Sequence, residues 1–169
     1  AHYPAMKRWM AHMEEATMKD YIMTKDQYGD WCMPPESQEL IHSKDPARKT
    51  DGAILSTTVY YDLLNKMIGF ARICGQDADI SGYESLAAKI KAAYNAKFFN
   101  KETAEYGNNT VTANILSLRL GLVPEGYEGK VFSNIVKKTE EDFNGHVSTG
   151  VLGIQHLMRG LTEYGRVDM

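Results

Sequence analysis

A carboxylate and an indole stand next to each other at Asp30 and Trp31, within a Tyr-Gly-Asp-Trp stretch. Carboxylates accept hydrogen bonds from sugar hydroxyls, and the flat face of an indole can stack on the C–H face of a sugar ring. Gly29 allows a sharp turn before this pair, and the Pro-Pro pair that follows forbids a helix. These residues indicate a sugar-binding loop. The alternative is that Trp31 anchors the core and Asp30 bonds to its own turn.

Other kinds of reactive site find little support in the residue spacing. Ser148 follows closely on His146, but Thr149 stands where a helix cap belongs, so we expect a cap there and no nucleophile. No glycine-rich phosphate loop follows a strand, and we expect no cofactor and no metal. None of the five histidines shows metal-ligand spacing: His2, His12, His42, His146 and His156.

Carboxylate chemistry therefore remains as the candidate activity. Glycoside hydrolysis uses two carboxylic acids across a sugar ring, with aromatic and polar neighbours that hold the sugar. The acids nearest the Asp-Trp pair, or on the loops expected beside it, are Asp30, Glu36, Glu39 and Glu105. Their spacing alone does not assign any of them as the acid or the base.

Composition is that of an ordinary globular protein. The chain has 169 residues and a formal charge of -3 with the two signs interspersed, so nucleic acid and anionic membranes are not expected partners. Its longest apolar runs are too short to cross a bilayer, so no membrane insertion is expected. Cys32 and Cys74 are expected to be free thiols, which leaves the compartment open.

The periodicity of apolar residues predicts six helices separated by loops of unequal length. The first long loop spans residues 17–53 and contains a short β-like patch near residues 20–31. A serine or threonine cap is expected before the second helix. The predicted helices cover residues 3–16, 56–73, 80–98 (or 83–98), 110–120, 126–143 and 149–164 (or 150–164).

A repeat of about 44 residues runs through these helices. The helix-ending glycines Gly75, Gly121 and Gly165 are 46 and 44 residues apart, and a Gly-Tyr-Glu triplet at 82–84 recurs at 126–128. Such a period predicts stacked helical hairpins, in either an open solenoid or a closed α/α toroid. The loops after the first, third and fifth helices are the aromatic-, Asn- and His-rich ones, so Trp31, Tyr106 and His146 are expected at one end of the array.

Several motifs in this order carry a family resemblance. They resemble the later part of the catalytic domain of bacterial α-L-rhamnosidases, the inverting six-hairpin glycosidases of glycoside hydrolase family 78. The motifs are Tyr28-Gly29-Asp30-Trp31, Ala53-Ile54-Leu55-Ser56-Thr57-Thr58-Val59-Tyr60-Tyr61, residues 91–99, Leu118 to Pro124, Ser148-Thr149-Gly150-Val151-Leu152-Gly153 and Leu161-Thr162-Glu163-Tyr164-Gly165.

The resemblance implies an (α/α)6 barrel whose inner helices begin at the substrate end. The second, fourth and sixth helices would be the inner ones, and the whole chain would be a single fragment holding about half of the toroid. Trp31 would line a rhamnose pocket, followed by Asp30, while Tyr106 and His146 are included because their loops share that end. The substrate would be a terminal α-L-rhamnose of a glycan or glycoside, and the parent enzyme could be periplasmic or secreted.

The family's acid and base motifs do not occur in this chain, so the fragment itself is expected to be inactive. A half barrel would expose the inner-helix face that bears Tyr60, Leu64 and Met67, which predicts self-association. Two alternatives stay open at this point: a non-catalytic helical-repeat interaction module, and another six-hairpin glycosidase or lyase.

Overall fold

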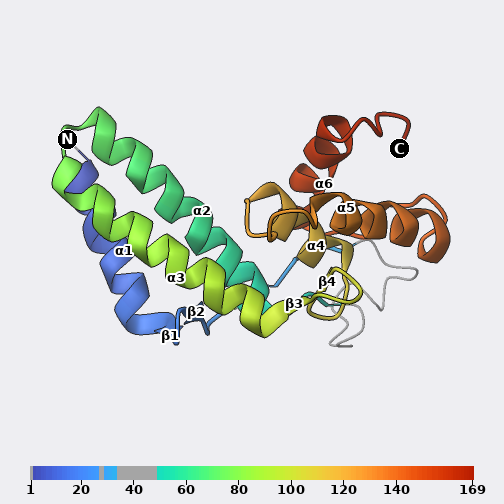
Figure 1. Ribbon diagram of the computed structural model, residues 1–169, viewed down its shortest axis with the longest axis horizontal. Helices are drawn as coiled ribbons and strands as arrows, with labels where there is room; N and C mark the ends of the chain where they lie inside the picture. Colours follow the sequence, from blue (N-terminus) through green and yellow to red (C-terminus); the bar gives the residue numbers. More distant parts are fainter. Residues whose placement is uncertain (1, 27–28, 34–48) are drawn as a thin grey trace.

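The computed structural model describes residues 2–26, 29–33 and 49–169, and within them the protein is mostly helical (Figure 1). The predicted all-α class is confirmed. Short 3₁₀ and π segments, η2 (Asp77–Asp79) and η3 (Lys138–Asp142), precede α3 and follow α5. The six α-helices are α1 (Tyr3–Thr17), α2 (Gly52–Ile73), α3 (Ile80–Phe98), α4 (Val111–Arg119), α5 (Glu128–Lys137) and α6 (Val151–Glu163).

Two small antiparallel hairpins connect some of these helices. Strands β1 (Met18–Lys19) and β2 (Ile22–Met23) pair Met18 with Met23, and β3 (Phe99–Asn100) pairs with β4 (Glu105–Tyr106). The β-like patch expected near residues 20–31 therefore exists, but it begins earlier and ends at Met23. Its tight turn is made by Asp20 and Tyr21, which both have positive φ.

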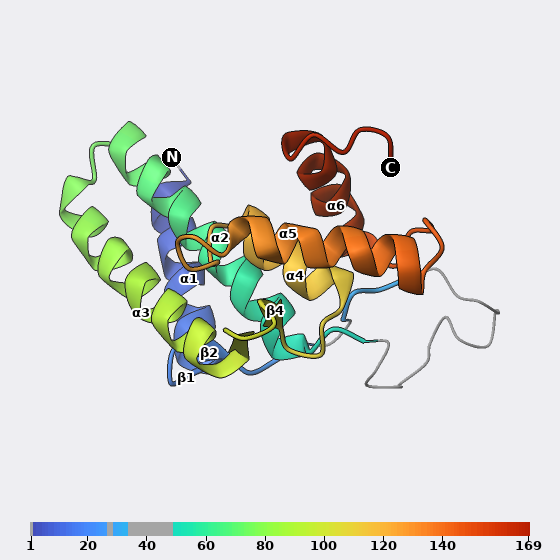
Figure 2. The same ribbon diagram turned by 45° about the vertical axis from the view of Figure 1, so that its right-hand side comes forward.

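The even-numbered helices form one layer with α4 in the middle, because α4 packs against both α2 and α6. Helix α3 packs against α2, and α5 packs against α4 (Figures 1 and 2). The starts of the three even helices are linked by side-chain contacts: Thr50 bonds to Thr110 at 2.6 Å, and Thr112 bonds to Asp30, which also bonds to Gly150. The predicted alternation is confirmed, since α2, α4 and α6 begin at the same end.

Left-handed glycines end the even helices, as the repeat predicts. Gly75, Gly121 and Gly165 follow α2, α4 and α6 with φ values of 65°, 76° and 79°. Residues with a Cβ rarely adopt this conformation, which explains why the glycine recurs at each helix end.

Helix boundaries differ from the prediction at two places. Helix α2 begins at Gly52, and its cap is Asp51, whose carboxylate accepts from the backbone N–H of Ala53 at 2.8 Å. The predicted Ser or Thr cap is wrong, because the carboxylate that starts the helix precedes the apolar periodicity. Helix α5 ends at Lys137 and the chain continues as the π-helix η3, where Thr139 donates to the carbonyl of Ile135 at 2.8 Å.

The face of α2 that was expected to be exposed is buried. Tyr60, Leu64 and Met67 are only 3%, 0% and 3% exposed, and the Tyr60 hydroxyl donates to the carbonyl of Met10 in α1. The prediction that this face is exposed and drives self-association is therefore wrong, because α1 and α3 cover this face of α2. Exposed apolar residues of α2 are instead Val59, Phe70 and Ile73.

Both cysteines, Cys32 and Cys74, are free and exposed, as predicted. Among the residues that the structure describes, no helix has the length and apolar character needed to cross a bilayer.

Candidate functional site

The carboxylate of Asp30 lies at the N-terminus of α6 and accepts hydrogen bonds from four donors. Its Oδ2 accepts from the backbone N–H of Gly150 at 2.8 Å and from the hydroxyl of Thr112. Its Oδ1 accepts from the backbone N–H groups of Leu152 and Gly153, at 3.0 and 3.1 Å. The first N–H groups of a helix have no partner within it, and a negative charge there is stabilised by the helix dipole. Asp30 thus caps α6 from 120 residues away in the chain.

The cap predicted at Thr149 is wrong. Its hydroxyl makes no hydrogen bond, although the residue is only 2% exposed, and the neighbouring Ser148 hydroxyl is also buried without a partner. Gly150 is the residue at the N-cap position, and it has no side chain to offer. Asp30 takes the place of a local cap, which sequence periodicity cannot reveal.

The backbone of Trp31 is hydrogen-bonded to the start of α6, whereas its side chain is exposed to solvent. Its carbonyl accepts from the backbone N–H of Val151 at 2.8 Å, next to the bonds made by Asp30. The Trp31 residue is 56% exposed, an unusual position for a large indole that has no core to fill. The structure therefore places an indole at the end where the even helices begin.

Gly150 allows the Asp30–Trp31 segment to come this close to α6. A Cβ built on Gly150 would collide with the backbone carbonyl oxygens of both Asp30 and Trp31. Because those are main-chain atoms, they cannot move aside as a flexible side chain can. We call residues 29–33, 49–51, 108–112 and 146–153 the rim, since they form the end of the array where α2, α4 and α6 begin.

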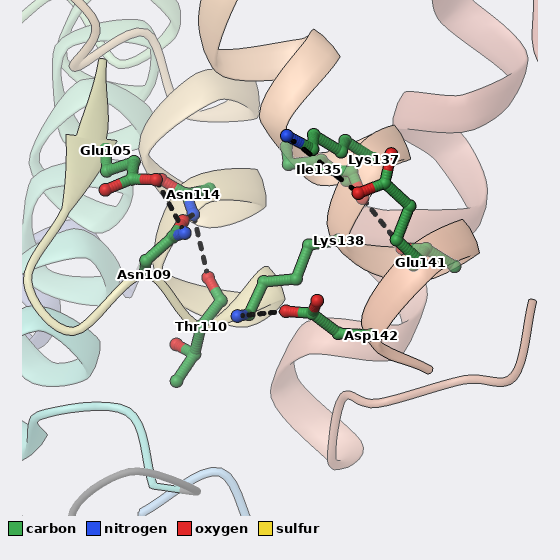
Figure 3. Close-up of polar contacts among 10 residues, drawn as sticks. Glu105, Asn109, Thr110, Asn114, Ile135, Lys137, Lys138, Glu141 and Asp142 are labelled. Atoms are coloured by element: carbon green, nitrogen blue, oxygen red, sulfur yellow. Dashed lines mark hydrogen bonds and ion pairs between the residues drawn. The ribbon is translucent and has the colours of Figure 1, made fainter. Parts of the chain in front are cut away.

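The start of α4 carries its own cap and a small amide network (Figure 3). The Thr110 hydroxyl accepts from the backbone N–H of Ala113 at 3.1 Å, which is a conventional local N-cap. Asn114 donates to Asn109, and Asn109 donates to Glu105 Oε1 at 2.7 Å. Glu105 therefore serves to hold the loop before α4.

The four sequence-predicted site residues divide into two buried and two exposed ones. Tyr106 lies in strand β4, just before the rim residues 108–112, but its side chain is 0% exposed and its hydroxyl donates to Asn95 at 2.7 Å. Burial raises the pKa of the Tyr106 hydroxyl well above its usual range. His146 is exposed, and its backbone N–H donates to the carbonyl of Phe143. Asp30 is buried and Trp31 is exposed.

Sequence reasoning did not identify Thr112 or Gly150 as parts of this arrangement. The one available signal was the run of small residues at 148–150, which permits close approach of another chain segment. Glu36 and Glu39, which were candidate acids, and Tyr28 lie outside the described residues. Within the described ranges, His, Cys, Asp and Glu side chains form no cluster of three that could hold a metal ion.

The opposite ends of α4 and α6 are joined by a polar cluster. Arg119 donates to both oxygens of Glu163, at 2.9 and 2.6 Å, and also contacts His156 Nδ1 at 3.3 Å. The pKa of Glu163 is lowered mainly by its hydrogen bond to Arg119. Burial and then the Arg119 charge lower the pKa of His156. The cluster fixes the two parallel helices at the end away from the rim.

Comparison with known proteins gives a consistent result over the whole chain. Residues 1–169 match the model of the family described as the bacterial alpha-L-rhamnosidase 6 hairpin glycosidase domain. An alpha-L-rhamnosidase of Formosa agariphila is 27% identical over 169 residues, which cover 99% of this chain and 17% of that protein. One from Streptomyces avermitilis is 24% identical and covers 98% of this chain and 14% of that protein.

Solved structures show the same similarity in three dimensions. The alpha-L-rhamnosidase from Dictyoglumus thermophilum superposes with a TM-score of 0.85 at 29% identity, over 98% of this chain and 18% of that one. The Streptomyces avermitilis enzyme complexed with L-rhamnose gives a TM-score of 0.82 at 22% identity, over 98% of this chain and 14% of that one. The chain spans less than a fifth of the length of these relatives.

Proposed function

The chain belongs to the bacterial alpha-L-rhamnosidase six-hairpin glycosidase family, and from this premise we propose that it supplies one wall of a rhamnose pocket. In this proposal the segment works as part of a longer catalytic domain that removes terminal α-L-rhamnose. The family match supports this proposal over the two alternatives left open by the sequence, an open helical-repeat module and a six-hairpin enzyme of another specificity.

One observation carries the proposal: the Trp31 indole is 56% exposed and lies at the rim, where α2, α4 and α6 begin. Deoxy sugars such as rhamnose have an apolar methyl group and C–H faces, so a flat aromatic surface is a suitable partner for them. The Streptomyces avermitilis relative, whose structure holds L-rhamnose, shares the fold of this segment. His146 is the other exposed residue among the four predicted site residues, and it is the candidate for a polar contact to the sugar.

The chemistry would be an inverting displacement that uses two carboxyl groups. One protonates the leaving oxygen and the other activates a water on the opposite face of the ring, at a separation of roughly 6.5–9.5 Å. Asp30 is a poor candidate for either role, since four donors already occupy its carboxylate. We therefore assign the acid and the base to residues outside this chain, and to this chain the task of orienting the sugar.

Two measurements on the purified 169-residue chain test this proposal. The chain should not hydrolyse a nitrophenyl α-L-rhamnoside, because it lacks the acid and the base. It should bind L-rhamnose weakly, and a titration followed by two-dimensional NMR should perturb the Trp31 indole N–H. Backbone amides of residues 29–33 and 146–153 should shift in the same titration, and Trp31→Ala should abolish these amide shifts.

The chain offers a matched control in its other tryptophan. Trp9 lies on α1 and is 49% exposed, so Trp9→Ala removes an indole of similar exposure far from the rim. Rhamnose binding should survive in this variant. Binding that persists in Trp31→Ala, or that is lost equally in Trp9→Ala, would contradict the proposed pocket wall, and steady turnover by the isolated chain would contradict the absence of the catalytic pair.

A further inference from the structure

We propose that Asp30 is a positioning residue, which fixes the Trp31 indole on the starts of α4 and α6 and does not itself contact the sugar. The inference rests on the proposed function of Trp31. It changes the role of Asp30 from sugar binding, which the residue types suggest, to support of the residue beside it.

The hydrogen-bonding capacity of the Asp30 carboxylate is fully used within the protein. An ionised carboxylate offers about four lone-pair sites. All four are matched by donors within the protein, from Thr112, Gly150, Leu152 and Gly153. The residue is also only 9% exposed. A sugar hydroxyl would have to displace one of these donors and leave it without a partner.

Hydrogen bonds made by Asp30 and by Trp31 attach both residues to the same first turn of α6. Trp31 accepts from the N–H of Val151 through its carbonyl, while Asp30 binds the N–H groups of Gly150 and Leu152 on either side. The Trp31 backbone is thus fixed directly beside the first turn of α6. Thr112 extends the attachment to α4, so movement of either helix start would move the indole.

The Asp30–Trp31 segment also packs closely against Gly150. Its missing side chain leaves just enough space for the carbonyl oxygens of Asp30 and Trp31. Gly150 therefore donates its N–H to the Asp30 carboxylate, and because Gly150 has no Cβ, the main chain of Asp30 and Trp31 can pack against its Cα. Such a contact positions a segment in one place, because a shift in either direction loses hydrogen bonds or collides with α6.

The experiment measures the order of Trp31 separately from sugar binding. In a Trp9→Phe background, Trp31 is the sole indole of the chain, so fluorescence anisotropy decay and acrylamide quenching report on it alone. Asp30→Asn keeps the size of the side chain but replaces one acceptor oxygen by a donor that faces the N–H groups of α6. We expect Trp31 to gain fast local motion, its quenching constant to rise about twofold, and rhamnose affinity to fall about tenfold.

Asp51→Asn is the matched control. Asp51 also caps a helix, α2, through a bond to the N–H of Ala53, and it lies at the same end of the array. Asparagine caps a helix as well as aspartate does, so this variant removes a carboxylate charge at a helix start, keeps the cap of α2 and should leave the Trp31 anisotropy unchanged. Thr112→Val removes one donor to Asp30 and should shift the anisotropy in the same direction as Asp30→Asn by a smaller amount, which provides a second test if Asp30→Asn does not fold by circular dichroism.

The outcomes separate this inference from the proposed function. Increased Trp31 motion in Asp30→Asn supports the positioning role even if neither protein binds rhamnose, in which case the proposed function alone fails. Unchanged Trp31 motion with loss of rhamnose binding would overturn the inference, because Asp30 would then contact the sugar directly. An equal increase of motion in Asp51→Asn would also overturn it, since the loss of a carboxylate charge at any of these helix starts would then have the same effect.

Discussion

Helices α4 and α6 start side by side at the same end of the molecule, yet their first turns are stabilised in different ways. Helix α4 uses Thr110, the residue directly before it, whose hydroxyl accepts from Ala113. Helix α6 has Gly150 at that position and uses the carboxylate of Asp30, which is distant in the chain. The local cap stabilises one helix, whereas the remote cap also attaches a separate loop to it.

This difference shows that the N-terminus of a helix can be the place where a distant loop attaches. A neutral hydroxyl at an N-cap satisfies one orphan N–H, but a buried carboxylate can satisfy three and add the favourable interaction with the helix dipole. The helix without a local cap is the one that holds the loop carrying the exposed indole. Three changes of decreasing effect test this comparison.

The largest effect is expected from removing the remote cap. Asp30→Ala would leave three backbone N–H groups and the Thr112 hydroxyl without their acceptor, and we expect the free energy of unfolding to fall by about 4 kcal/mol. Thr110→Ala, at the local cap, should lower it by about 1 kcal/mol. Urea unfolding followed by circular dichroism gives both values, and equal losses would refute the distinction between the two helix starts.

A smaller effect is expected from filling the space at the contact. Gly150→Ala places a methyl group against the main-chain oxygens of Asp30 and Trp31 and should destabilise the protein by about 2 kcal/mol. Gly69→Ala, in the interior of α2, meets no atom within 4 Å and is its control. That variant should gain about 0.5–1 kcal/mol, as alanine favours a helix interior. A stabilising Gly150→Ala would mean that the loop does not approach α6 this closely.

The smallest effect concerns the other ends of the same two helices and depends on pH. The pKa of His156 is lowered in the folded protein, so near the ordinary histidine pKa of 6.5 the folded state binds fewer protons than the unfolded state. This contribution to stability is complete above that pH and is lost as the pH falls through the folded pKa. Stability measured by urea unfolding should therefore decrease from pH 7 to pH 5.

His156→Gln should reduce that decrease, because the replacement does not titrate. The lowered pKa of Glu163 acts in the same direction, but at more acidic pH, near and below the ordinary glutamate pKa of 4.5. An identical pH profile in the variant would show that His156 has no part in it. The remote cap at the rim should remain intact in this variant, and Trp31 fluorescence would verify that.

The features that could be predicted from the sequence are those set by nearby residues. The number and order of the six helices, the glycines after the even helices and the common end at which those helices begin follow from periodicity and turn chemistry and agree with the structure, whereas the starts of α2 and α6 and the end of α5 do not. Tyr106 shows the limit of this reasoning: its loop lies at the predicted end, but the β3–β4 hairpin turns its side chain toward Tyr94 in the core.

Asp30 shows a different limit. Its residue type and its indole neighbour were both compatible with sugar binding, and its partners on α6 lie 120 to 123 residues further along the chain. Hydrogen bonds of that separation leave no periodic signal. Likewise, the burial of Tyr60, Leu64 and Met67 depends on how α1 and α3 close over α2, which the apolar pattern of α2 alone does not specify.

The long separation between Asp30 and α6 also determines when the rim can form. During synthesis, Trp31 leaves the ribosome well before residues 150–153, so its loop has no attachment point until the start of α6 has been made. Contacts between distant residues carry a large loop-closure cost and tend to form late in folding. Nascent chains that end before α6 should therefore contain folded α1–α3 helices and an unattached Trp31 loop, and the indole would become ordered only after α6 has been made.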